Sequence, residues 1–109
     1  MSETLKAVQG FVAAGQVRFS GHGYDELSAD GLYARDIIAG VAAAVVVEDY
    51  PAFPKGPAVL VLQWDRDGKP IHVVWGIPRG FTSPAVVVTA YRPEPDRWDV
   101  GFMKRRGKS

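Results

Sequence analysis

The dipeptide Asp67-Gly68, which separates two runs of apolar residues, constrains the fold of this chain more than any other feature. Asp-Gly in that setting predicts a β-hairpin closed by a two-residue type I′ turn, with strands over 58–65 and 70–77. The opposed pairs would be Trp64 with Ile71, Leu62 with Val73, Leu60 with Trp75, Gln63 with His72 and Val61 with Val74. One face of the hairpin would be large and apolar, and the other would be a mixed surface that carries His72.

Helical spacing of apolar residues precedes the hairpin, and β-branched runs flank it. The spacing predicts helices over residues 3–14, 22–28 and about 33–43. The valine-rich runs 44–50 and 85–92 predict two further strands. We therefore expect an α+β fold in which N-terminal helices pack on a four-stranded antiparallel sheet, with the residues after the last strand folding back onto it.

The chain has 109 residues, of which 47% are hydrophobic and none is cysteine. We expect one domain over residues 1–109, with 104–109 as a flexible basic tail. Without cysteine, the chain excludes disulfides, zinc fingers and a thiol nucleophile. The uncharged run 37–47 has eleven residues, well short of the roughly 20 that a membrane helix needs, and the N-terminus lacks a signal-peptide pattern. We expect a cytoplasmic protein that does not bind membranes.

The net charge of +1 hides an opposite polarity of the two halves. Residues 21–50 hold six acidic residues and one basic residue, a net −5, whereas residues 51–109 hold ten basic and five acidic residues, a net +5. An anionic partner such as RNA would therefore bind the second half.

Short motifs spread over residues 17–105 resemble a known family. They are Phe19-Ser20-Gly21-His22 with Glu26-Leu27, Asp30-Gly31-Leu32 with Asp36-Ile37, Glu48-Asp49-Tyr50-Pro51, Gly56-Pro57 with Leu60, Asp67-Gly68-Lys69-Pro70-Ile71-His72-Val73-Val74, and Thr89-Ala90-Tyr91-Arg92-Pro93 with Trp98. The pattern resembles the bacterial family called domain of unknown function 4258, which is similar to the RelE and ParE toxins of toxin–antitoxin systems. The resemblance implies a RelE/ParE-like fold. RelE-like members cleave messenger RNA on the ribosome, and ParE-like members act on DNA gyrase.

Three residues are candidates for catalysis: His72, His22 and Tyr91. Cleavage of RNA by its own 2′-hydroxyl needs a base, an acid and a cation beside the phosphorane, and histidine can act as acid or base near neutral pH. Tyr91 and Arg92 are adjacent in a strand and point to opposite faces, so at most one of them joins His72. The alternative is a structural His72 bonded to its neighbours.

Five residues are candidates for binding: Arg79, Arg92, Glu26, Glu48 and Tyr50. His22 and Glu26 share a helical face, where they could contact phosphate, orient the helix start or form part of a metal pair that lacks further ligands. Glu48 and Tyr50 share strand parity and could face a histidine, or Tyr50 could be an aromatic residue at the edge of the core. In the second half of the chain, basic residues alternate with aromatic ones. Such a pattern is typical either of a surface that contacts phosphate groups or of a solvated C-terminus. The basic residues are Arg79, Arg92, Arg97, Lys104, Arg105 and Arg106, and the aromatic residues are Phe81, Trp98 and Phe102.

Two functions remain open from the sequence. The first is a toxin-like, metal-independent and cofactor-independent ribonuclease that acts on RNA or on the ribosome through His72. The second is a non-catalytic module that binds a protein, such as a cognate antitoxin. The two hypotheses differ in whether His72 is accessible to a substrate.

Overall fold

The computed structural model describes residues 2–80 and 84–106, and for His22 and Glu26 it describes the backbone only. The elements in chain order are α1 (Glu3–Ala13), β1 (Val17–Phe19), α2 (Gly21–Ala29), α3 (Ala34–Gly40), a 3₁₀ turn (Val41–Ala43), β2 (Val45–Tyr50), β3 (Ala58–Trp64), β4 (Pro70–Gly76) and β5 (Ala85–Tyr91). These bounds confirm the three predicted helices and the four predicted strands to within a few residues. None of the helices among the described residues is long and apolar enough to span a membrane.

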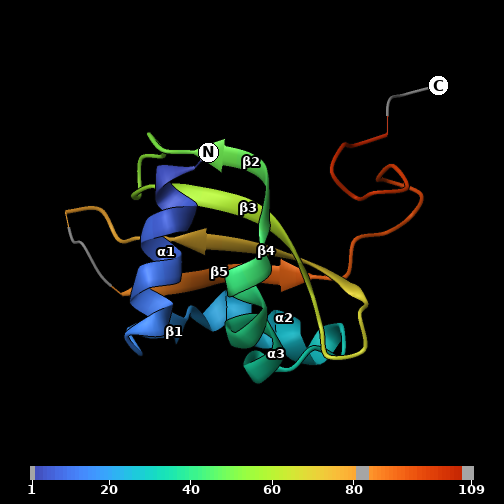
Figure 1. Ribbon diagram of the computed structural model, residues 1–109, viewed down its shortest axis with the longest axis horizontal. Helices are drawn as coiled ribbons and strands as arrows, with labels where there is room; N and C mark the ends of the chain where they lie inside the picture. Colours follow the sequence, from blue (N-terminus) through green and yellow to red (C-terminus); the bar gives the residue numbers. More distant parts are fainter. Residues whose placement is uncertain (1, 81–83, 107–109) are drawn as a thin grey trace.

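The sheet has five strands in the order β1-β5-β4-β3-β2 (Figure 1). Strands β2 to β5 form antiparallel pairs, but β1 pairs with β5 in parallel. The predicted four-stranded antiparallel sheet was therefore wrong, and the sheet is mixed. The three residues of β1 are too few to show an alternating pattern, and their partners in β5 lie far along the chain. Because β1 and β4 flank it, β5 is a central strand, which explains its valines on both faces.

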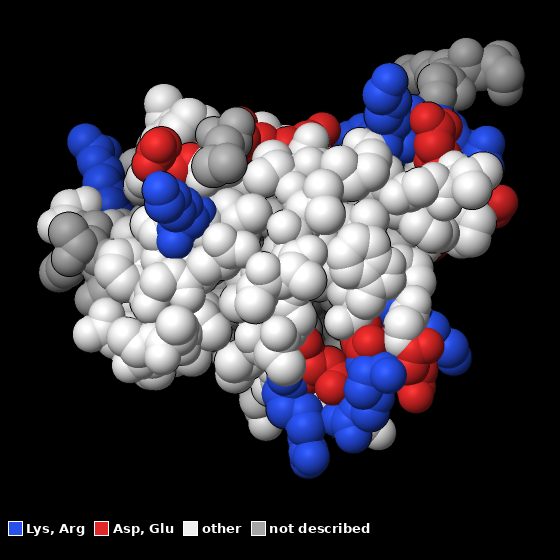
Figure 2. Space-filling model, in the orientation of Figure 1, with Lys and Arg blue, Asp and Glu red and all other residues white. Residues whose placement is uncertain are grey.

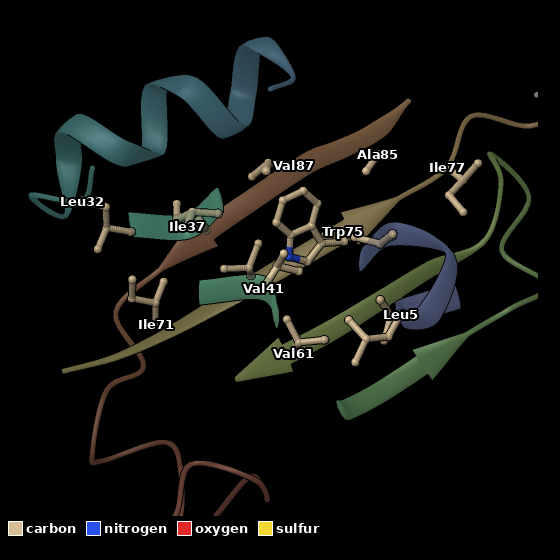
Figure 3. Close-up of a cluster of buried hydrophobic side chains, with 14 of the residues drawn as sticks. Leu5, Leu32, Ile37, Val41, Val61, Ile71, Trp75, Ile77, Ala85 and Val87 are labelled. Carbon is tan, nitrogen blue, oxygen red and sulfur yellow. The ribbon is translucent and has the colours of Figure 1, made fainter. Parts of the chain in front are cut away.

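Helices α1 and α2 begin at hydroxyl caps, and α3 begins after Tyr33 without a side-chain cap. The Ser2 hydroxyl accepts a hydrogen bond from the Leu5 amide at 3.0 Å, and the Ser20 hydroxyl accepts one from the Gly23 amide at 2.9 Å. Residues from all three helices join residues from β3, β4 and β5 in one buried cluster around Trp75 (Figure 3). We call this side of the sheet the helix face and the opposite side the open face.

The turn between β3 and β4 differs from the prediction. The Gly68 amide donates to the Asp65 carbonyl at 2.9 Å, and the Asp65 amide donates to the Lys69 carbonyl at the same distance. Gly68 has φ of 78°, whereas Asp67 does not have the positive φ that a type I′ turn requires at both central residues. The loop therefore has three residues and ends with a left-handed glycine, and the type I′ prediction was wrong.

The longer loop shifts the register of the hairpin by one residue. His72 pairs with Leu62 and not with Gln63, which pairs instead with Ile71 on the helix face. There Gln63 is fully buried; its Nε2 donates to the Ile37 carbonyl at 2.9 Å, and its Oε1 accepts from Trp75 Nε1 at 2.8 Å. Trp64, predicted to lie on the apolar face, shares the open face with His72 and is 40% exposed. Changing the register by one residue moved Gln63 and Trp64 of β3 to the other face, whereas His72 of β4 kept its predicted face.

After β5, residues 93–106 fold back against the open face, and we call them the C-terminal segment. Trp98 is buried, its backbone bridges to Arg105, and its ring contacts His72. Figure 1 shows this segment at the end of the sheet where β5 ends, away from the loop that follows β2. On the face drawn in Figure 2, charged side chains of both signs gather near this segment and near the β3–β4 turn, and the middle is uncharged.

Candidate functional site

A polar cluster lies on the open face where β2, β4 and β5 approach the C-terminal segment. Strand pairing places His72 opposite Tyr91 in β5 and opposite Leu62 in β3. Glu48 of β2 pairs with Leu60, which is two residues from Leu62, and it therefore lies on the same face as His72. A bulge at Val47 re-aligns β2 so that Glu48 and Tyr50 both point to this face. The predicted residues His72, Tyr91, Glu48 and Tyr50 therefore share one surface.

His72 is completely buried, and both of its ring nitrogens have partners. Nε2 lies 2.8 Å from the carbonyl oxygen of Phe102, and Nδ1 lies 3.2 Å from the Tyr91 hydroxyl. A carbonyl oxygen only accepts hydrogen bonds, so Nε2 carries the proton and donates it. The neutral ring then has a lone pair on Nδ1, to which the Tyr91 hydroxyl donates. The contact with Phe102 thereby determines the tautomer that faces Tyr91.

Aromatic rings enclose the imidazole. Its centroid is 4.3 Å from that of Trp98 and 5.4 Å from that of Tyr91, both in edge-to-face geometry. Burial in this cage lowers the pKa of His72 below its usual 6.5, although the hydrogen bond to Phe102 opposes the shift. The ring is therefore neutral at physiological pH. Because it is completely buried, a substrate cannot reach it directly, which favours the structural role of His72 over direct catalysis, and any proton exchange with a ligand would have to pass through Tyr91.

Tyr91 connects the buried histidine to a pocket. The pocket has a volume of about 570 Å³ and lies between the end of β5 and the C-terminal segment; its lining comprises Asp30, Tyr91, Arg92, Glu94, Asp96, Arg97, Trp98, Arg105 and Arg106. Burial raises the pKa of the Tyr91 hydroxyl, so the phenol keeps its proton at neutral pH. Tyr91 thus lines the pocket, and its hydroxyl bonds the imidazole of His72.

Glu48 binds the C-terminal segment to the sheet. It accepts hydrogen bonds from Arg105 Nη2 at 2.8 Å and from the Tyr50 hydroxyl. The hydrogen bond from Arg105 lowers the pKa of Glu48, and the bond to Glu48 raises the pKa of Tyr50. Arg105 also stacks over Trp98, with its guanidinium carbon 4.9 Å from the ring centroid. This one arginine therefore connects β2 with the residue that covers His72.

Arg92 and Arg79 lie apart from this cluster. The Arg92 guanidinium is 2.7 Å from Asp65, and its amide donates to Asp30, so the side chain joins the β3–β4 turn to the end of β5. That location agrees with the prediction that only one of Tyr91 and Arg92 can join His72. Arg79 follows the opposite end of β4 and reaches the Pro54 carbonyl. Of the five binding candidates, only Glu48 and Tyr50 lie near His72 among the side chains that the structure describes.

The two remaining candidates lie outside what the structure describes. His22 and Glu26 belong to α2, but their side chains are outside the described part of the chain, and so is Phe81. Within the described part, no group of three or more His, Asp or Glu side chains could hold a metal ion.

Sequence reasoning missed the partners that the C-terminal segment supplies. The sequence predicted that the residues after the last strand fold back onto the sheet, and the contact of Trp98 with His72 agrees with this. It did not predict that Trp98, the Phe102 carbonyl and Arg105 enclose His72 or its neighbours. Within the predicted tail, Arg105 and Arg106 form hydrogen bonds, and residues 107–109 lie outside the described residues. The signal that could have found them was that aromatic and basic residues alternate after the last strand.

Comparison with known proteins assigns a family to the chain. The family model described as Domain of unknown function (DUF4258) matches residues 19–92, about two thirds of the sequence. The chain belongs to this family. No curated protein and no solved structure matches it.

The DUF4258 match covers only part of the cluster. It contains Glu48, Tyr50, His72 and Tyr91, and it ends at Arg92. Trp98, Phe102 and Arg105 follow the matched region. The strand residues of the cluster thus come from the family domain, and the residues that cover them come from the C-terminal segment.

Proposed function

We propose that this DUF4258 protein is a toxin-like, metal-independent ribonuclease in which Tyr91 and His72 transfer a proton. The observation that carries the proposal is the hydrogen bond between the Tyr91 hydroxyl and His72 Nδ1. The contact of Nε2 with the Phe102 carbonyl makes Nδ1 the acceptor in this bond. Tyr91 lines a pocket that also contains four arginine residues and three acidic residues, and arginine side chains are suited to binding phosphate groups. RNA is proposed as the substrate because the sequence motifs resemble a family that is similar to the RelE toxins, whose members cleave messenger RNA.

The proton movements follow from the tautomer of His72. The 2′-oxygen of a bound ribonucleotide attacks the adjacent phosphorus, and its proton passes to the Tyr91 oxygen while the Tyr91 proton passes to His72 Nδ1. The resulting imidazolium keeps its Nε2 proton on the Phe102 carbonyl. The bond to the 5′-oxygen breaks, that oxygen takes a proton from solvent, and the products are a 2′,3′-cyclic phosphate and a 5′-hydroxyl. His72 Nδ1 then returns its extra proton to the Tyr91 oxygen while the Tyr91 proton passes to solvent, which restores the starting state. A pocket arginine, Arg105 or Arg106, neutralises charge on the phosphorane.

The test uses a single-stranded RNA oligonucleotide and, separately, messenger RNA on ribosomes. The variant Tyr91→Phe keeps the ring but removes the transferred proton, and Tyr24→Phe is its control at a site that is 65% exposed. We expect cleavage to fall about 100-fold or more in Tyr91→Phe and in His72→Ala, as for loss of a general base, and to be unchanged in Tyr24→Phe. Circular dichroism checks that each variant is folded.

Two outcomes would contradict the proposal. Equal cleavage by Tyr91→Phe and the parent protein would remove the Tyr91–His72 pair from the mechanism. Absence of cleavage with and without ribosomes would favour the alternative, a non-catalytic module that binds a protein. Growth arrest on expression, relieved by the product of a neighbouring gene, would test the toxin–antitoxin assignment independently of the chemistry.

A further inference from the structure

The open face has an apolar groove at the end of the sheet opposite the C-terminal segment, and none of the described residues covers it. The groove has a volume of about 390 Å³ and is formed by the loop after β2, the end of β4, the start of β5 and part of β1. In Figure 1 these parts lie at the left end of the sheet, whereas the C-terminal segment lies at the right. The groove and the Tyr91 pocket share no described lining residue. The groove is therefore a separate site from the Tyr91 pocket, although Tyr50 both lines the groove and bonds Glu48 of the polar cluster.

Three large apolar side chains are exposed to solvent around the groove. Tyr50, Phe53 and Val88 are 41%, 50% and 40% exposed and lie together around it. Val88 occupies a bulge in β5, which takes it out of the regular pairing with β4. Large apolar side chains that gather in one exposed concave surface are typical of binding sites.

The rim of the groove is positively charged. Arg18 and Lys55 are exposed and line it, and no acidic residue is among its described lining residues. Arg79 lies beside Lys55, because its amide donates to the Lys55 carbonyl at 2.9 Å. An occupant should therefore combine apolar side chains for the floor with negative charge for the rim.

A second copy of the chain does not meet this requirement. A two-fold contact through the groove would oppose Arg18 and Lys55 to the same residues of the other copy, and like charges across an interface are unfavourable. A lipid bilayer would supply negative charge, but its flat surface does not fill a concave groove. A peptide segment can insert single side chains between Phe53 and Val88, as amphipathic helices do in apolar grooves.

We propose that the groove binds an acidic amphipathic helix of another protein. Its apolar side would cover Tyr50, Phe53 and Val88, and its carboxylates would pair with Arg18 and Lys55. Arg79, which the sequence suggests for binding and which the Tyr91 cluster does not include, would strengthen the attraction.

The probe is a fluorescein-labelled synthetic helix of about 18 residues, which is five turns, with leucine along one side and glutamate elsewhere. Fluorescence anisotropy measures its dissociation constant for the full chain. A second peptide carries lysine in place of every glutamate. We expect the acidic peptide to bind at least about tenfold more tightly than the basic peptide, with a difference that shrinks as salt is added.

Matched variants locate the binding site. Phe53→Asp and Val100→Asp both place a carboxylate at an exposed apolar residue, but only Phe53 lines the groove, and Val100 is 90% exposed elsewhere. Arg18→Glu reverses a rim charge, and Lys6→Glu reverses an exposed charge on α1. We expect Phe53→Asp and Arg18→Glu to weaken binding at least about tenfold, and the two controls to bind like the parent.

Several results would overturn the proposal. These are equal binding of the acidic and basic peptides, binding unaffected by Phe53→Asp, and no binding at millimolar protein. Self-association in analytical ultracentrifugation that Phe53→Asp abolishes would identify a second copy as the occupant. Co-sedimentation with phosphatidylglycerol vesicles that Arg18→Glu abolishes would identify a membrane. Peptide binding by Tyr91→Phe separates this proposal from RNA cleavage, because that variant leaves the groove unchanged.

Discussion

His72 Nε2 and the carbonyl oxygen of Phe102 are 2.8 Å apart, although thirty residues separate them in the chain. This bond attaches the C-terminal segment to the middle of β4, and it determines which ring nitrogen faces Tyr91. Phe102 has φ of 59°, an uncommon value for a residue other than glycine, so the backbone adopts a strained conformation where its carbonyl meets His72.

Tyr91→Phe should destabilise the fold, because the Nδ1 acceptor of a fully buried ring loses its donor. We expect the free energy of unfolding to fall by about 1–3 kcal/mol in urea titrations. Tyr24→Phe, at an exposed tyrosine, should change it by less than about 0.5 kcal/mol. Equal stability of the two variants would mean that the Tyr91 hydroxyl does not bond His72 in solution.

The lowered pKa of His72 makes stability depend on pH. Below about pH 6.5 the unfolded state binds a proton at this histidine, whereas the folded state does not until the pH reaches the lowered pKa of His72. The contribution of His72 to the free energy of unfolding is therefore fully present above pH 6.5, and it is lost as the pH falls toward the lowered pKa. Arg105 lowers this pKa further by its charge, and Glu48 opposes it. Unfolding measured between about pH 7.5 and 5.5 should show the loss in the parent and a shallower loss in His72→Gln. Identical slopes would show that His72 is not the titrating group.

Gln63→Ala should be among the most damaging single substitutions in β3. It opens a cavity in the core and removes the partners of Trp75 Nε1 and the Ile37 carbonyl. We expect a loss of about 2–4 kcal/mol in the free energy of unfolding. The control Gln16→Ala, at an exposed position, should stay within about 0.5 kcal/mol of the parent. A similar effect of both substitutions would contradict the buried network.

Two glycine substitutions should change stability in opposite directions. Gly68→Ala introduces a side chain at φ of 78° and should cost about 1–2 kcal/mol. Gly10 lies inside α1, and a methyl group added there would meet no atom within 4 Å, so Gly10→Ala should stabilise the protein by about 0.5–1 kcal/mol. Thermal unfolding followed by circular dichroism measures both. A neutral Gly68→Ala would argue against the three-residue loop.

Local patterns in the sequence were sufficient to predict most elements. The apolar spacing in α1 and the valine runs in β2 and β5 are signals carried by consecutive residues, so their bounds were predicted closely. The hairpin itself was predicted, but its register was wrong, because Asp67-Gly68 fits both a two-residue and a three-residue loop. That difference of one residue moved Gln63 into the core and changed the partner of His72.

The candidate site shows the same division between local and long-range information. Strand parity in the sequence indicated that Tyr91 and Arg92 separate and that Glu48 and Tyr50 share a face. The burial of His72, its tautomer and its attachment to Phe102 depend on a segment without regular periodicity.

The sequence alone determined the helices, four of the five strands and the shared face of Glu48 and Tyr50. Only the tertiary structure decided the parallel β1, the hairpin register, the cover over His72 and the apolar groove. Periodicity reports how neighbouring residues divide between solvent and core. These remaining features arise where distant segments meet, and packing and hydrogen bonding across those contacts select the arrangement.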